Sequence, residues 1–152
     1  MAKFKHIDDT LSVSAQLTES DISNAADEGF MTIINLRPDG ENADAMTDET
    51  ARSIAHSCGL QHAHIPINPK VITDDVADTL GKAFVRAKQP VLAYCGTGKR
   101  ATLLWATTLA GSKNPQDVLA LAVNAGFDLV ELMPRIEQRA LSHTENSAYL
   151  FW

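Results

Sequence analysis

The sequence predicts a single α/β domain with three layers, in which helices flank a mostly parallel central sheet. Apolar, β-branched stretches of strand length alternate with amphipathic stretches of helix length along most of the chain. This alternation is typical of parallel strands joined by helices. The chain has 152 residues and is 45% hydrophobic, so it can bury a core. We assign residues 1–141 to this domain and 142–152 to a C-terminal tail.

The first half of the chain carries clear start and stop signals. Thr18 and Asp21 form a capping box, and Gly29 ends the helix that this box begins. Thr47 and Gly59 bracket a second helix in the same way. The predicted elements are one or two strands within 4–14, a helix over 18–29, a buried strand over 31–36, a helix over 47–59 and a strand over 62–67.

The second half repeats the alternation. Pro90 marks the start of a buried strand, because proline is tolerated at the first residue of a strand. The helix that follows this strand is apolar nearly all round, which predicts a central position. The predicted elements are a helix over 73–87, a strand over 91–95 and helices over 99–110, 114–126 and 128–140.

The loop after the strand over 91–95 carries the chemistry. Cys95 ends the strand, Gly96 and Gly98 allow a tight turn, and the next helix points its positive end at the same place. Backbone N–H groups and positive charge there would form an anion-binding cup that favours a thiolate, which is a nucleophile. The alternative is that Cys95 is a buried filler. The cup residues are Gly96, Thr97, Gly98, Lys99, Arg100 and Ala101.

The composition of the chain argues against several classes of binding partner and location. The net charge of −6 argues against binding to nucleic acid or to an anionic membrane. No apolar run approaches a membrane span, and two cysteines do not make a disulfide framework, so we expect a cytoplasmic protein. His62 and His64 share a strand face without a third ligand, so we interpret them as half-exposed strand residues and expect no metal or cofactor. Cys58 belongs to an apolar helix stripe.

Several motifs resemble known families. The spacing Cys95-x4-Arg100 resembles the loop of rhodanese sulfurtransferases, whereas the order of strands resembles a protein tyrosine phosphatase of the dual-specificity type. From about Ile7 to Arg139 the chain is similar to a bacterial family, the phosphatase-like domain of beta-lactamase hydrolase-like proteins, also labelled a sulfur transferase family. The matching segments include 29–41, the Cys95 loop with 104–106, and 125–129.

The resemblance implies roles for the loop residues. Cys95 would be the nucleophile, and Arg100 would bind the anion with two hydrogen bonds. This family usually has arginine after the cysteine and serine after the loop arginine, but this chain has Gly96 and Ala101. Thr102 would then supply the hydroxyl that supports the thiolate. The substrate would be a small anion such as thiosulfate, a persulfide or a phosphate ester.

Two reactions and one binding function remain open. A phosphatase needs an acid that protonates the leaving group, and Asn68 stands where the resemblance would place it. Sulfur transfer needs no acid, so a sulfurtransferase that forms a Cys95 persulfide is favoured over a phosphatase that forms a phosphocysteine, and over a non-catalytic module that binds anions or phosphoproteins. The remaining candidates, as a general acid or at the rim of the pocket, are Arg37, Asp39, Glu41 and Asp74. The aromatic end of the tail, 149–152, could mediate an oligomer.

Overall fold

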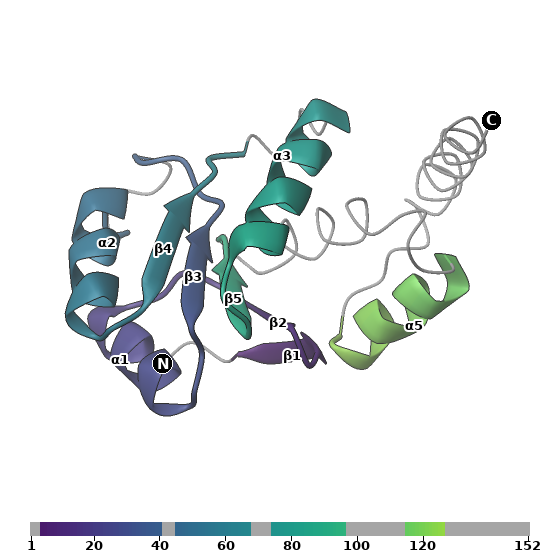
Figure 1. Ribbon diagram of the computed structural model, residues 1–152, viewed down its shortest axis with the longest axis horizontal. Coiled ribbons are helices and arrows are strands. Elements are labelled where there is room, and N and C mark those ends of the chain that lie inside the picture. Colours follow the sequence, from purple (N-terminus) through teal and green to yellow (C-terminus); the bar gives the residue numbers. More distant parts are fainter. Residues whose placement is uncertain (1–3, 41–44, 68–73, 97–114, 127–152) are drawn as a thin grey trace.

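The computed structural model describes residues 4–40, 45–67, 74–96 and 115–126, which form a three-layer α/β arrangement (Figure 1). The strands in these residues are β1 (Lys5–Asp8), β2 (Leu11–Ser14), β3 (Thr32–Asn35), β4 (Gln61–His64) and β5 (Val91–Tyr94). The helices in the same residues are α1 (Glu19–Asp27), α2 (Asp48–Ser57), α3 (Asp74–Arg86) and α5 (Pro115–Asn124). The predicted fold class is confirmed.

The sheet has the order β1-β2-β5-β3-β4. Strands β2, β5, β3 and β4 run parallel, and only β1 is antiparallel to its neighbour. Strand β5, the last of the described strands, therefore occupies the middle of the sheet. The strand predicted over 62–67 is shorter than expected and covers Gln61–His64, although the backbone N–H groups of Ile65 and Ile67 still donate to the carbonyls of Asn35 and Leu36.

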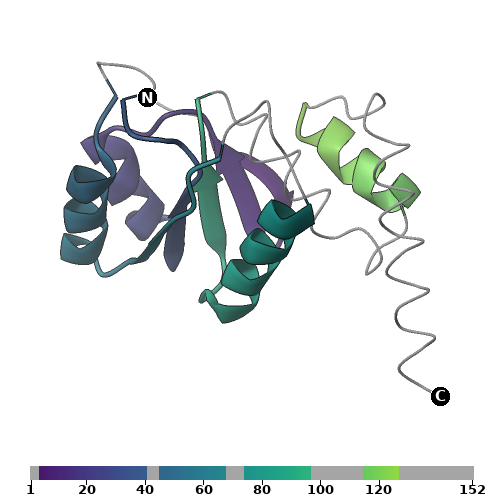
Figure 2. The same cartoon turned by 90° about the horizontal axis from the view of Figure 1, so that it is seen from above.

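Each face of the sheet packs against its own pair of helices (Figure 2). The face toward α3 and α5 buries alternate residues of β5, namely Val91 and Ala93, and Cys95 beyond the strand. The face toward α1 and α2 buries Leu92 and Tyr94. Successive strand side chains point to opposite faces, so a strand that is buried on both reads as a continuous apolar run.

The predicted caps are present where the structure describes them. Thr18 Oγ1 accepts a hydrogen bond from Asp21 N (3.3 Å), and Asp21 Oδ2 accepts one from Thr18 N (2.8 Å). Gly29 follows α1 with a φ of 97°, a conformation that glycine adopts without strain. Thr47 caps α2 by accepting a hydrogen bond from Thr50 N.

Some predicted segments lie outside the described residues. These are the helices over 99–110 and 128–140, the cap at Thr73 and the tail over 142–152. None of the helices in the described ranges is long and apolar enough to cross a membrane.

Candidate active site at the carboxyl end of the sheet

Cys95 lies at the carboxyl end of the middle strand. Its backbone N–H donates to the carbonyl of Ser14 (3.2 Å), which extends the β2–β5 ladder by one residue. The residue is 1% exposed and packs with Leu36 and Ile67 on the face toward α3. In parallel α/β sheets, ligands bind outside the carboxyl ends of the strands. Cys95 therefore stands at the edge where a substrate site is expected.

Only part of the predicted loop is described. Gly96 follows Cys95 and is half-buried. The other predicted cup and support residues lie outside the described part of the chain: Thr97, Gly98, Lys99, Arg100, Ala101 and Thr102.

Arg37 and Gln16 flank the end of β5 from the two neighbouring strands. Tyr94 is in register with Ser14 on β2 and with Asn35 on β3. Arg37 and Gln16 each follow those partners by two residues, so both stand level with Gly96. Arg37 Nη1 donates to Gln16 Oε1 (2.8 Å), and this hydrogen bond crosses the carboxyl end of β5. The guanidinium group is thus held at the same edge as Cys95.

The candidate acids have different positions. Asp39 Oδ1 accepts a hydrogen bond from the N–H of Asp48 (2.8 Å), the first residue of α2. A carboxylate at a helix N-terminus is a structural acceptor, so this contact does not favour proton donation by Asp39. Glu41 lies outside the described residues, as does the side chain of Asp74, the first residue of α3.

A row of polar side chains crosses the sheet just before Cys95. Ser14, Tyr94, Asn35 and His64 are register partners on four adjacent strands. They lie on the same face as Leu92 and Ile33 by strand alternation, which is the face toward α1 and α2. In the sequence, each of these four strands ends on a polar residue. Only the register of the folded sheet shows that the four side chains lie in one row.

Asp48 of α2 contacts two members of this row, Asn35 and His64, and also His62. Its Oδ1 lies 3.1 Å from Asn35 Nδ2 and 3.0 Å from His62 Nε2. Its Oδ2 lies 3.3 Å from His64 Nδ1 and 3.4 Å from Arg52 Nη2. The side chain is 8% exposed, so its charge is largely removed from water and requires these partners. The sequence analysis missed Asp48.

His62 and His64 are strand residues of intermediate exposure, as predicted, but the sequence did not predict what their rings contact. The His62 side chain is 0% exposed, and both rings contact Asp48. His62 Nε2 lies 3.0 Å from Asp48 Oδ1, but neither ring nitrogen of His62 has a hydrogen-bond partner within the described residues. The described residues contain no group of three or more His, Cys, Asp or Glu side chains that could hold a metal ion.

Burial lowers the pKa of His62, and the attraction of Asp48 offsets this only in part. Arg52, His64 and His56 lower it further, because each adds positive charge nearby. His62 is therefore neutral near pH 7.

We expect His62 to make stability depend on acidity. As pH falls through the ordinary value of 6.5, the unfolded chain takes up a proton at His62 before the folded chain does. The free energy of unfolding then decreases as pH falls from about 7 to about 5. Urea unfolding should show a weaker decrease in His62→Gln and an unchanged one in His6→Gln, whose ring is exposed. Equal slopes in all three proteins would contradict the prediction.

The hydroxyl of Tyr94 is buried beside the same cluster. It has no hydrogen-bond partner within the described ranges, and the same holds for Ser14 Oγ. Burial raises the pKa of Tyr94, and the carboxylates of Asp48 and Asp39 raise it further, whereas Arg37 opposes them. The phenol is therefore neutral and is a costly group to bury.

Tyr94→Phe is expected to keep or raise stability, by up to about 1 kcal/mol, because it removes a buried hydroxyl that lacks a partner and keeps the ring. Thermal and urea unfolding would measure the change. A decrease of more than about 1 kcal/mol in the free energy of unfolding would contradict the prediction, because it would mean that the hydroxyl makes a stabilising hydrogen bond.

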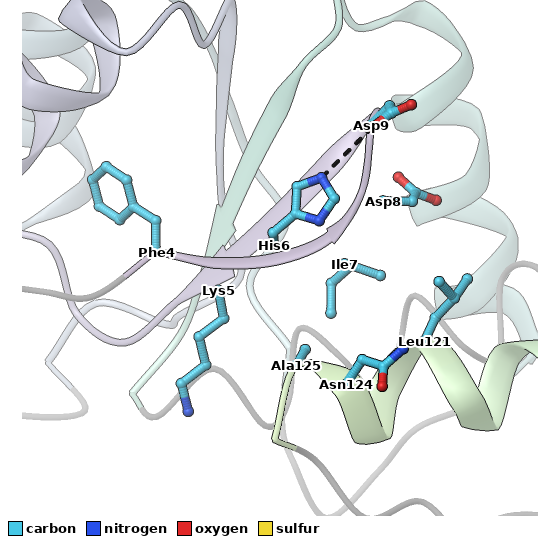
Figure 3. A pocket seen from close by; sticks show the side chains of 9 residues that line it. All are labelled: Phe4, Lys5, His6, Ile7, Asp8, Asp9, Leu121, Asn124 and Ala125. Atoms are coloured by element: carbon cyan, nitrogen blue, oxygen red, sulfur yellow. Dashed lines mark ion pairs between the residues drawn. The ribbon is translucent and has the colours of Figure 1, made fainter.

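A separate open groove of about 690 Å³ runs between β1 and α5 (Figure 3). His6 and Asp9 form an ion pair on its β1 side (3.7 Å). The turn that ends β1 is level with Val91, at the amino end of β5. Cys95 does not line this groove, so it is not part of the candidate active site. Its lining residues are Phe4, Lys5, His6, Ile7, Asp8, Asp9, Leu121, Asn124 and Ala125.

The chain is similar to a known protein family and to curated relatives of greater length. A family model described as "Beta-lactamase hydrolase-like protein, phosphatase-like domain" matches residues 3–112. A beta-lactamase hydrolase-like protein of Xylella fastidiosa is 29% identical over 145 residues. The match covers 94% of this chain but 34% of that protein, so the chain spans about a third of the length of this relative.

Solved structures share this fold, and one of them is described as a candidate phosphatase. A candidate phosphatase from Neisseria meningitidis is 30% identical, with a TM-score of 0.80 and coverage of 88% of this chain and 96% of that one. The Pseudomonas aeruginosa protein TpbA, solved with phosphotyrosine, is 14% identical, with a TM-score of 0.66 and coverage of 94% and 95%. The tyrosine-phosphatase type of fold is thereby confirmed.

Proposed function

Because this chain belongs to the family of the phosphatase-like domain of beta-lactamase hydrolase-like proteins, we propose that it is a cysteine-dependent hydrolase of phosphate monoesters. The observation that carries the proposal is the position of Cys95, buried at the carboxyl end of the middle parallel strand. Arg37 is held across the same strand end by Gln16. A candidate phosphatase and a protein solved with phosphotyrosine share this architecture.

The proposed reaction has two steps. The Cys95 thiolate attacks phosphorus, the bond from phosphorus to the leaving oxygen breaks, and a phosphocysteine forms. Water then attacks phosphorus, the bond from sulfur to phosphorus breaks, and inorganic phosphate and the thiolate are released. Arg100 and the N–H groups of residues 96–101 would bind the phosphoryl oxygens.

Protonation of the leaving group limits the choice of substrate. The carboxylate of Asp39 is engaged at the start of α2, and Asn68 stands at the position where the family resemblance would put an acid. Substrates with acidic leaving groups, such as aryl phosphates, need little protonation. We therefore expect aryl phosphates to be hydrolysed faster than alkyl phosphates.

Sulfur transfer is the second candidate, and the same engagement of Asp39 favours it. Thiosulfate would pass its outer sulfur to the Cys95 thiolate, forming a persulfide and releasing sulfite. The bond between the two sulfur atoms of thiosulfate breaks, charge is conserved, and no proton donor is needed. The six-residue spacing from Cys95 to Arg100 resembles that of sulfurtransferases.

One experiment separates the candidates. The full chain and Cys95→Ser are incubated with p-nitrophenyl phosphate or with thiosulfate, then quenched in acid, and phosphate release and intact mass are measured. Phosphate release and a phosphoryl adduct that both require Cys95 support the hydrolase. A gain of one sulfur atom that cyanide reverses, without phosphate release, would replace the hydrolase with the transferase. Anion binding without turnover or adduct would indicate a binding module.

A further inference from the structure

The backbone of Arg37 is held by neighbouring side chains on both sides. Its N–H donates to Asn35 Oδ1 (2.9 Å), and its carbonyl oxygen lies 2.8 Å from Nε2 of His64. A neutral imidazole with its proton on Nε2 satisfies the second contact. The ladder continues up to this point, because the N–H of Leu36 donates to the carbonyl of Tyr94 (3.0 Å). Residue 37 therefore has a fixed place at the carboxyl end of β3, whatever side chain it carries.

The side-chain amide of Gln16 is oriented from both of its ends. Nε2 donates to the carbonyl oxygen of Leu17 (3.1 Å), and Oε1 accepts from Arg37 Nη1 (2.8 Å). The opposite orientation would set the NH₂ group, a donor, against a guanidinium, which only donates, so the orientation is assigned from these partners. Gln16 is half-buried. The amide therefore determines where the guanidinium lies.

The Arg37 side chain leaves β3 on the face of the sheet opposite to Cys95. Leu36 packs toward α3 together with Cys95, so alternation turns residue 37 to the face toward α1 and α2. The hydrogen bond to Gln16 then takes the guanidinium across the end of β5, level with Gly96. Gly96 has no side chain that could cover the charge from a molecule bound at the start of the loop.

The partner of Arg37 orients its charge without cancelling it. Gln16 is a neutral acceptor, whereas a carboxylate at the same place would neutralise the guanidinium. A guanidinium is a planar group whose N–H donors match the oxygens of a phosphate. A group that is already ordered before binding loses less conformational entropy when the anion arrives. This arrangement is suited to binding an anion beside Cys95.

We propose that Arg37 binds the anionic group of the substrate beside the Cys95 loop, and that Gln16 is the positioning residue that holds the guanidinium there. The choice of a phosphate monoester as the ligand rests on the proposed function. The guanidinium comes from the side of β5 opposite to the one on which Cys95 packs. It therefore binds phosphoryl oxygens away from the bond that forms to sulfur. Such a contact is similar in the ground state and the transition state, so it lowers KM more than it raises kcat.

Inorganic phosphate tests the binding without turnover. Titrated into the full chain at pH 7 and constant ionic strength, it should shift the nitrogen-15 NMR signals of the Gly96 amide and the Arg37 side chain. Arg37→Gln should raise the Kd for phosphate by about 10-fold or more, because it removes a charged hydrogen-bond donor. Arg37→Lys should fall between the two, since it keeps the charge but not the planar group. A parent that does not bind phosphate, or an unchanged Kd in Arg37→Gln, would overturn the proposal.

A double-mutant cycle tests the role of Gln16. Gln16→Met keeps the length of the side chain and removes the acceptor, so it should raise the Kd for phosphate by about 3- to 10-fold. In the Arg37→Gln background the same substitution should change the Kd by less than about 1.5-fold, because Gln16 acts through Arg37. Equal effects in the two backgrounds would overturn the positioning role.

Gln61 provides the matched control at the amino end of the sheet. Its Oε1 also accepts hydrogen bonds, from Thr32 Oγ1 (3.4 Å) and from the N–H of Lys88 (3.3 Å). Gln61→Met therefore makes the same chemical change far from the Cys95 loop and should bind phosphate as the parent does. A Kd raised as much as in Gln16→Met would mean that the loss is not specific to the contact with Arg37, which would overturn the positioning role.

Kinetics separate this role from the proposed function. With p-nitrophenyl phosphate, Arg37→Gln should raise KM by about 10-fold and change kcat by less than about threefold. A decrease confined to kcat would overturn the binding role. If the parent binds phosphate through Arg37 but does not hydrolyse the ester, the proposed function fails and the anion site stands.

Discussion

Cys95→Ser is expected to lower the turnover of p-nitrophenyl phosphate by about 1,000-fold or more, because a serine hydroxyl at this position lacks the reactivity of a thiolate. The free energy of unfolding should decrease by about 1–3 kcal/mol, because a hydroxyl replaces a less polar thiol at a buried position among apolar side chains. The backbone contact to Ser14 does not involve the side chain and should persist. Steady-state kinetics and urea unfolding measure the two quantities separately.

Cys58 provides the matched control. It caps the end of α2 and packs against the face of the sheet opposite to Cys95. Cys58→Ser should retain turnover within about threefold, since it removes a thiol without touching the carboxyl edge of the sheet. If Cys58→Ser lost activity as Cys95→Ser does, the two cysteines would act together, and a single-thiolate mechanism would be wrong.

Local sequence signals predict most of the fold because they act over a few residues. The capping box at Thr18 and the glycine after α1 are visible as residue types at fixed offsets, and both are present. Successive side chains of β5 are buried on opposite faces of the sheet, so the strand appears in the sequence as an uninterrupted apolar stretch. This stretch allowed the strand that precedes Cys95 to be predicted. Strand ends were less predictable: β4 stops before Pro66.

The polar network could not be predicted because it depends on contacts distant in sequence. His62 and His64 alternate with apolar residues, as side chains on an exposed strand face would. What buries them is Asp48, on a helix that precedes the strand and packs over the same face. Likewise, Asp39 had the residue type of a general acid, but its position at the start of α2 is a property of the folded loop.

Asp48→Ala is expected to lower the free energy of unfolding by about 3 kcal/mol, the largest stability effect we predict. The carboxylate accepts hydrogen bonds from Asn35 and Arg52 and lies against the rings of His62 and His64. Its removal leaves a buried amide without its acceptor and opens space beside the two rings, and both changes are costly. Glu49→Ala, in the same first turn but exposed, should cost less than about 1 kcal/mol through the helix dipole alone. Equal losses from the two substitutions, measured by urea unfolding, would contradict a special role for Asp48.

The charge of Asp48 can be separated from its shape with a double-mutant cycle. Asp48→Asn keeps the size of the side chain but turns an N–H group toward either Asn35 or His64, so it should also destabilise. Because His64 Nδ1 lies against Asp48 Oδ2, His64→Gln should cost less stability in the Asp48→Asn background than in the parent, by about 1 kcal/mol or more. Additive losses would mean that the two side chains stabilise the fold independently, and the 3.3 Å contact between them would then carry little energy.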